Sequence, residues 1–214
     1  DENGNPIKQR LGNTVPTTTG GFGFDGHVGN FDFNVFFNYS LGNKIVNGTK
    51  LANAFYSGSN KKYNLVDDFT LDKRYTWIDP NNGLNLGKIS TSTITTYGGT
   101  EEVMARLNEL NQGKSIYNPA AVTAMQLTDY AVEDASFLRL KTVTLGYTVP
   151  KTFLKKYKID NARLYVAAQN LWTITGYSGY DPEVSIRSGG LTPGLDFSSY
   201  PRALSVSFGI NLGF

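Results

Sequence analysis

Several stretches of the chain alternate between large apolar residues and small or polar ones, which is the side-chain period of a β-strand. The longest alternation covers residues 203–214, and a second one covers residues 31–41. Their apolar positions are Leu204, Val206, Phe208, Ile210, Leu212 and Phe214, and Phe31, Phe33, Val35, Phe37 and Tyr39. A shorter alternation at residues 20–28 precedes the second stretch, and Gly29-Asn30 between them is a two-residue hairpin signal. The pattern predicts three strands, two of them joined by a tight turn.

Two weaker alternations predict strands at residues 135–149 and 162–172, joined by a short basic connection. The apolar positions of the first are Val143, Leu145, Tyr147 and Val149. The same period of two also puts Arg139 and Lys141 on that apolar side. The beginning of this strand is therefore the least regular part of the pattern.

The connections between the predicted strands are alternately short and long. The long ones lie near residues 1–19, 42–134 and 173–202. This order is typical of an outer-membrane β-barrel, which has tight periplasmic turns and large extracellular loops. A soluble β-sandwich gives the same alternation, so both interpretations stay open on pattern alone. Small and polar residues opposite the apolar side, and aromatic residues near strand ends, favour the barrel.

The long connection at residues 42–134 contains one helical pattern. Residues 101–112 place Val103, Leu107 and Leu110 at helical spacing. Thr100 is the expected N-cap and Gly113 the expected stop. The loop is therefore predicted to carry a short amphipathic helix.

The composition supports β-structure and excludes several classes of function. The chain has 214 residues, 23 Gly, 13 Tyr and 13 Phe, and 18% charged residues, against about 25% in a typical domain. The absence of cysteine excludes disulfides, cysteine-ligated zinc and thiol catalysis. A net charge of +2 argues against nucleic acid as a partner. The start lacks the basic and apolar regions of a signal peptide, so we expect a mature product or a piece of something longer.

No catalytic or metal-binding pattern is present in the sequence. His27 is the only histidine, and a single histidine does not make a zinc site without carboxylates from elsewhere. Asp67-Asp68 and Glu101-Glu102 are adjacent pairs, which are poor candidates for a glycosidase dyad. Ca²⁺ in the loops has no ligand pattern to support it. We therefore expect neither an enzyme nor a cofactor.

Several motifs resemble those of one family of membrane proteins. Ser207, Gly209, Leu212 and Phe214 are similar to the signal that barrel-assembly machinery reads in a last strand. The runs ASFLRLK at residues 135–141, QNL at 169–171 and GYDPE at 179–183 follow one another in the family's order. The chain thus resembles the C-terminal part of a SusC/RagA-type TonB-dependent transporter of Bacteroidetes, except at about residues 47–128.

The resemblance implies an all-β fold in which residues 1–214 supply about five C-terminal strands of a large antiparallel transmembrane barrel. It implies an outer-membrane importer of large nutrients, glycans or peptides, with the C-terminus on the periplasmic side. The expected partners are a SusD-like surface lipoprotein, the rest of the barrel, the barrel-assembly machinery, membrane lipid, and TonB through parts outside this chain. The alternative is a soluble all-β carbohydrate-binding module.

The barrel interpretation assigns roles to particular residues. The residues expected to face lipid are Phe31, Phe33, Val35, Phe37, Leu204, Val206, Phe208 and Ile210. Tyr177, Tyr180, Asp181 and Glu183 in the last long loop are candidates for contact with substrate or with the lid protein. A second interpretation of the loop is a rigid turn, in which Asp181 caps, Pro182 fixes a dihedral angle and Tyr180 packs.

Overall fold

The computed structural model describes residues 8–54, 66–121, 127–183 and 194–214. The chain divides into two compact units. The first comprises Asp1–Thr49 and Thr128–Phe214, and the second comprises Lys50–Leu127. The predicted strands all belong to the first unit, and the predicted helix belongs to the second.

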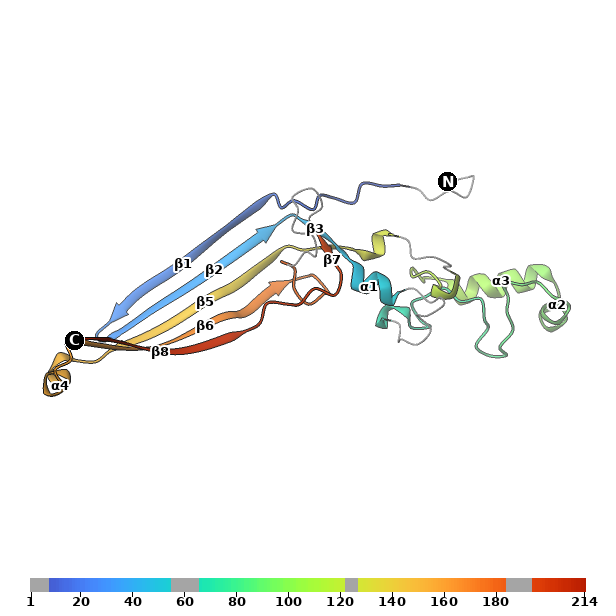
Figure 1. Cartoon of the computed structure of the whole chain (residues 1–214). Coiled ribbons are helices and arrows are strands. Elements are labelled where there is room, and N and C mark those ends of the chain that lie inside the picture. Colours follow the sequence, from blue (N-terminus) through green and yellow to red (C-terminus); the bar gives the residue numbers. More distant parts are fainter. Residues whose placement is uncertain (1–7, 55–65, 122–126, 184–193) are drawn as a thin grey trace. The chain divides into compact units, whose positions relative to one another are not determined.

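The first unit is built on a single antiparallel sheet with the order β1-β2-β5-β6-β8 (Figure 1). Its strands are β1 (Thr18–Val28), β2 (Phe31–Leu41), β5 (Phe137–Thr148), β6 (Asn161–Thr175) and β8 (Ser205–Gly213). Gly29, with a φ of 61°, forms the turn between β1 and β2, where a left-handed residue matches the strand twist. The five expected antiparallel strands are confirmed. In the described residues, β1 pairs only with β2 and β8 only with β6.

One face of this sheet is apolar across all five strands. The register aligns Phe33 of β2 with Leu145 of β5, which aligns with Val166 of β6 and then with Phe208 of β8. Phe31, Val35 and Phe37 share this face, as do Val206 and Ile210, and Leu204 lies just before β8. Phe208 is 83% exposed, so the part of the chain that the structure describes leaves it uncovered.

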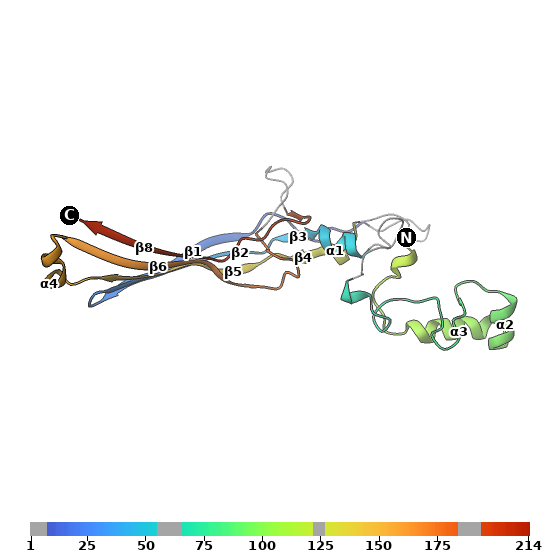
Figure 2. The ribbon, with the colours of Figure 1, turned by 60° about the horizontal axis from the view of Figure 1, so that its bottom comes forward.

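Neither face of the sheet carries a second layer. Figure 2 shows the sheet nearly edge-on as a single layer, and no described helix or strand of the first unit packs along its length. A β-sandwich needs a second sheet over the apolar face. The soluble sandwich left open by the sequence pattern is therefore not the fold of these residues.

The opposite face is formed by small and polar residues, with large side chains lying over glycines. A Cβ on Gly21 would come within 2.6 Å of the Phe36 ring. Arg163 of β6 reaches across β5 to Asp32 of β2, and its Nε donates to Asp32 Oδ1 at 2.9 Å. The backbone of Gly146 lies beneath this ion pair, so the missing side chain is what allows the pair to form.

A β-bulge shifts the phase of β5 near the long-loop end of the sheet. The pairing with β2 passes from Thr142 directly to Leu140, which leaves Lys141 as the extra residue. Arg139 then pairs with Asn38 on the polar face. The prediction that Arg139 lies on the apolar side was wrong, because it assumed an uninterrupted period of two. Lys141 lies at the bulge itself, where that period is broken.

A small second sheet with the order β4-β3-β7 lies at the long-loop end of the first unit (Figure 1). Its strands are β3 (Lys44–Asn47), β4 (Val132–Asp134) and β7 (Leu195–Asp196), with the short helices η4 (Asp129–Ala131), α4 (Lys151–Leu154) and η5 (Lys155–Tyr157) elsewhere in the unit. Ile45 of β3 forms a buried hydrophobic cluster with Ala135 and Tyr177. The compact core of the first unit is therefore at its loop end.

The second unit is a small helical insertion. Its elements are α2 (Thr91–Tyr97), α3 (Thr100–Asn111), η2 (Asp67–Phe69) and η3 (Pro119–Ala121), and α1 (Gly48–Asn53) leads into it. Asp79 is buried and accepts hydrogen bonds from Arg106 of α3 and from Tyr97 of α2. The Arg106 guanidinium, opposed by burial, holds the pKa of Asp79 far below its usual range. This ion pair is the polar centre of the insertion.

The sequence located α3 but not all of its detail. Val103 is buried and Leu107 is half-buried, as the helical spacing predicts. Gly99 is the N-cap and Thr100 the first helical residue, so the expected cap was misplaced by one position. α2 was not anticipated, because Thr-rich sequence is a poor helix former; a capping box between Ser90 and Thr93 stabilises it.

Among the described residues, no helix has both the length and the apolar character needed to cross a membrane.

We predict that Gly146→Ala destabilises the full-length protein by about 1–3 kcal/mol, because the added Cβ overlaps with the Arg163 and Asp32 side chains. Denaturant unfolding of the protein measures the change. Gly176→Ala is the matched control, since a Cβ there meets nothing within 4 Å. An unchanged midpoint for Gly146→Ala would contradict the close approach of the three strands.

Candidate functional site

The long-loop end of the sheet carries a group of charged and polar side chains, which we call the rim cluster (Arg139, Thr173, Asp181, Glu183 and Arg202). The bulge in β5 turns Arg139 to the polar face, where it is only 2% exposed. Its Nη2 lies 2.5 Å from Asp181 Oδ1, its Nη1 lies 3.0 Å from Glu183 Oε2, and its Nε donates to Thr173 Oγ1 at 3.0 Å. The guanidinium thus fixes the loop that follows β6 onto the end of the sheet.

Asp181 is satisfied on every side. Its Oδ1 also accepts the Glu183 amide at 3.0 Å, and its Oδ2 accepts the Arg202 amide at 3.1 Å. Burial alone would raise the pKa of Asp181, but these two amides and the Arg139 guanidinium outweigh burial and lower the pKa from its usual value. The carboxylate therefore stays ionised and joins β5, the loop after β6 and the segment before β8.

A second buried network anchors the same loop. The Tyr177 hydroxyl donates to Asp196 Oδ2 at 2.6 Å. Burial, reinforced by this hydrogen bond, raises the pKa of Tyr177 well above its usual range. Ser178 donates to Glu133 through both its amide and its hydroxyl, each at 2.8 Å. The loop is thereby tied to the small sheet as well as to the rim cluster.

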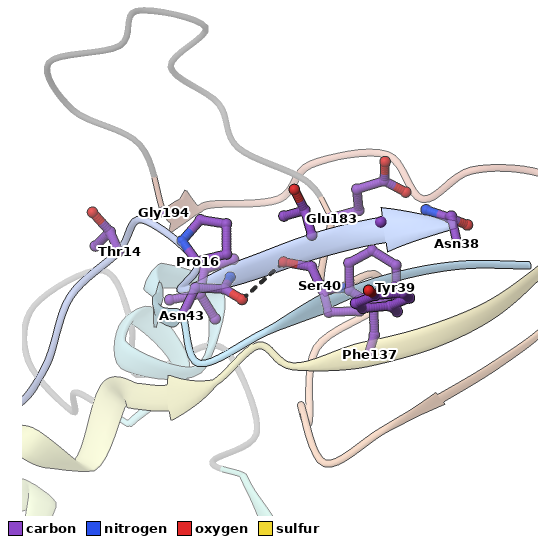
Figure 3. A pocket seen from close by; sticks show the side chains of 13 residues that line it. Thr14, Pro16, Asn38, Tyr39, Ser40, Asn43, Phe137, Glu183 and Gly194 are labelled. Atoms are coloured by element: carbon purple, nitrogen blue, oxygen red, sulfur yellow. Dashed lines mark hydrogen bonds between the residues drawn. The ribbon is translucent and has the colours of Figure 1, made fainter. Parts of the chain in front are cut away.

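A hollow of about 370 Å³ lies beside the rim cluster (Figure 3). Its walls come from the segment before β1, from β1 and β2, from the start of β5 and from the loop after β6. Thr14, Pro16, Asn38, Ser40, Asn43, Phe137 and Glu183 are among the lining residues. The Ser40 hydroxyl donates to Asn43 Oδ1 at 3.2 Å within this wall. The lining mixes amide, hydroxyl and carboxylate groups with apolar surface.

The structure separates the four residues proposed from the sequence for substrate or lid contact. Tyr177 and Asp181 are 6% and 3% exposed and fully engaged in internal contacts, so their side chains shape the loop. Tyr180 is 78% exposed, and Glu183 lines the hollow while bonded to Arg139. Asp181 accepts the amide two residues on, as the rigid-turn interpretation predicts, but Tyr180 does not pack.

The residues expected to form the assembly signal lie in or next to β8. Ser207 and Gly209 are on the polar face, and the Tyr165 ring lies over Gly209. Leu212 is on the apolar face, and Phe214 is 85% exposed. Gly209 thus has a packing reason to be glycine in addition to the expected signal.

Sequence reasoning did not identify Arg139, Arg202 or Glu133 as site residues. For Arg139, the one available signal was a charged residue at a position that the period of two assigns to the apolar side of the strand. Among the described residues, no three His, Cys, Asp or Glu side chains are grouped so as to hold a metal ion. The charged side chains of the rim cluster are joined to one another by ion pairs.

Relatives with the same fold and similar sequence are known. The chain is 30% identical over 209 residues to TonB-dependent receptor P3 of Formosa agariphila, which covers 95% of this chain and 17% of that protein. It is 37% identical over 89 residues to TonB-dependent receptor SusC of Bacteroides thetaiotaomicron, covering 41% of this chain and 8% of SusC. No family model matches the chain. As the coverages of P3 and SusC show, the chain spans only a small part of the length of these relatives.

Solved structures confirm the fold. The chain superposes on the RagAB peptide importer in its "closed-closed" state with a TM-score of 0.68 at 21% identity, over 96% of this chain and 18% of that one. The "open-open" state gives 0.65 at 23% identity, over 94% and 17%. The relatives are named as receptors and importers, not as enzymes.

The single two-faced sheet and these superpositions define the chain as an arc of a large antiparallel outer-membrane β-barrel. The sequence relatives are TonB-dependent receptors, and the chain fits a part of a protein of the SusC/RagA family.

We predict that Arg139→Gln costs about 3–5 kcal/mol of folding stability, because it leaves the Asp181 carboxylate buried without its cation. Thermal unfolding and protease resistance of the loop in the full-length protein measure the loss. Arg202→Gln is the control, since the Arg202 side chain is 44% exposed and the change should cost less than about 1 kcal/mol. Equal effects of the two variants would refute the central role of Arg139.

Proposed function

We propose that this chain forms part of the wall of an outer-membrane importer of large nutrients, glycans or peptides. The observation that carries the proposal is a sheet with one apolar face and one small and polar face, which the described residues leave uncovered and unpaired at the β1 and β8 edges. Bare strand edges are not viable in lipid, because their backbone groups stay unpaired there, and an open apolar face of this size is unfavourable in water. Further strands that close the sheet satisfy both edges, and lipid covers the apolar face.

The connection lengths support an orientation for this wall. The β1–β2 and β5–β6 connections are short and lie at one end of the sheet, and the long connections lie at the other (Figure 1). In outer-membrane barrels the short turns are periplasmic. Phe214 then lies on the periplasmic side, and the rim cluster and the hollow face the outside.

The outward rim is where this chain contacts substrate or a SusD-like lipoprotein lid. Tyr180 offers an exposed aromatic ring, which suits either a sugar face or a peptide side chain. Glu183 adds a carboxylate in the wall of the hollow. Tyr177 and Asp181 act indirectly by holding the loop in place. RagAB is titled a peptide importer, which makes peptides one class to test. TonB acts through parts of the transporter outside this chain.

The expected assembly signal extends the proposal to biogenesis. Ser207, Gly209, Leu212 and Phe214 would be read by the barrel-assembly machinery while β8 pairs with its neighbours. The residue types and spacing of these four positions resemble the signal of a last barrel strand, which supports this assignment.

We predict that Phe208→Lys destabilises the barrel by about 2–4 kcal/mol, because an ammonium group would enter the hydrocarbon region. Ser207→Lys, one position along the same strand but on the opposite face, should cost much less. Urea unfolding of the full-length protein in phospholipid vesicles measures both. Equal losses of stability for the two variants would contradict the proposal that one face of the sheet contacts lipid and the other contacts water.

Import itself is tested by uptake of fluorescent oligosaccharide and peptide pools into cells expressing the full-length protein. Uptake should require TonB, and Tyr180→Ala should lower it several-fold without lowering the amount of protein in the outer membrane. Tyr157→Ala, an exposed tyrosine in the β5–β6 turn, is the control. Uptake that persists without TonB would refute the import proposal, whereas unchanged uptake by Tyr180→Ala would refute only the role of Tyr180.

A further inference from the structure

The apolar face of the sheet is grooved near its short-turn end. The groove has a volume of about 280 Å³, and its apolar lining comes from Phe31, Leu145, Tyr147, Leu164, Val166 and Phe208. These side chains belong to two neighbouring rows of the sheet, because Tyr147 pairs with Phe31 and Leu164, and Val166 pairs with Leu145 and Phe208. Aromatic rings on β2 and β8 flank smaller side chains on β6. The groove is thus a trough in the face that we assign to lipid.

The turn that joins β5 and β6 is strongly basic. It carries Lys151, Lys155, Lys156 and Lys158 against a single acid, Asp160, so residues 150–161 have a formal charge of +3 (four lysines minus one aspartate). All four lysines are exposed, and within the described residues none of them forms an ion pair with a carboxylate. Their charges are therefore available to an anion from outside the chain.

The same turn exposes two aromatic side chains. Phe153 is 70% exposed and Tyr157 is 67% exposed, and the Lys156 amine lies 6.0 Å from the centre of the Tyr157 ring. Exposed aromatic residues mixed with lysines are typical of the level at which hydrocarbon gives way to lipid headgroups. A turn that extended only into water would have no reason to present these rings.

The groove and the basic turn are parts of one surface. The turn connects β5 and β6, the two strands that supply most of the groove lining (Figure 1). Lys151 follows Tyr147 by four residues, so it lies no more than about 14 Å from the groove wall. An apolar trough that ends beside a cluster of cations matches a molecule with an acyl chain and an anionic head.

We propose that this groove and turn form a binding site for an anionic phospholipid of the leaflet at the short-turn side, with an acyl chain in the groove and the phosphate at the lysines. The proposal rests on the proposed function, since the groove must face lipid. An anionic lipid surface attracts each nearby lysine by an amount equivalent to about fivefold in binding. Charge complementarity and the apolar trough together favour a lipid over an acidic protein segment, which would use the cations but not the groove.

The test uses the full-length transporter in mixed micelles that contain equal amounts of phosphatidylglycerol and phosphatidylethanolamine with matched acyl chains. Mass spectrometry counts the lipids retained after detergent exchange. The wild-type protein should retain phosphatidylglycerol in preference. The triple variant Lys151→Gln, Lys155→Gln, Lys156→Gln should lower that retention by at least about tenfold. The control triple Lys73→Gln, Lys88→Gln, Lys114→Gln removes the same charge from the second unit and should change nothing.

A second pair of variants tests the groove. Val166→Phe fills the trough with a larger apolar side chain and should lower the retention of both lipids at this site. Val206→Phe adds the same volume to the same face outside the groove lining and should leave retention unchanged. Both changes keep the face apolar, so membrane insertion is preserved.

The outcomes separate the site from the transporter assignment. Equal retention of the two lipids by the wild type, or undiminished phosphatidylglycerol on the lysine variant, overturns the proposed site while the membrane barrel stands. Loss of a co-purifying protein from the lysine variant, with lipid retention intact, makes the turn a protein-docking surface and also overturns it. A full-length protein that is absent from the outer membrane refutes the proposed function itself, and the lipid site with it.

Discussion

The alternation of side chains between the two faces of each strand is the constraint on which the rest of this structure depends. Because side chains alternate strictly in a strand, a shift of one residue exchanges the two faces of the sheet. The strict alternation is uninterrupted in the rows from Phe31 to Val35, so the large apolar residues there all lie on one face. The bulge at Lys141 then shifts β5 by one residue. Arg139 reaches the polar face only because of that shift, and the rim cluster forms around it.

The regular strands of the fold could be predicted from the sequence. Features that depend on pairing with neighbouring strands could not. The alternation near Phe208 and the hairpin at Gly29 follow from local chemistry, so the strands could be predicted. The bulge at Lys141 is defined by pairing with strands distant in sequence, and a single period could not reveal it. α2 depends on a capping box that outweighs weak intrinsic propensity. For the site, the loop motif near Asp181 was found, but its cationic partner was assigned to the wrong face.

Glycine explains how the polar face accommodates large side chains without a second layer. Phe36 lies over Gly21, the Asp32–Arg163 pair lies over Gly146, and Tyr165 lies over Gly209. In each case one strand omits a side chain where a neighbour extends one. The face is therefore smoother than its composition suggests. It also means that Gly209 serves the folded sheet whether or not it is read during assembly.

The helical insertion leaves and re-enters the first unit through a paired stem. β3 precedes it and β4 follows it, and Val46 pairs directly with Val132. The chain ends that flank the insertion are therefore held side by side by backbone hydrogen bonds that do not involve the insertion. Each doubling of a loop closed by such a stem costs only about 0.6 kcal/mol. Evolution can thus exchange this segment for one of another length or composition while the sheet that it leaves is inherited unchanged.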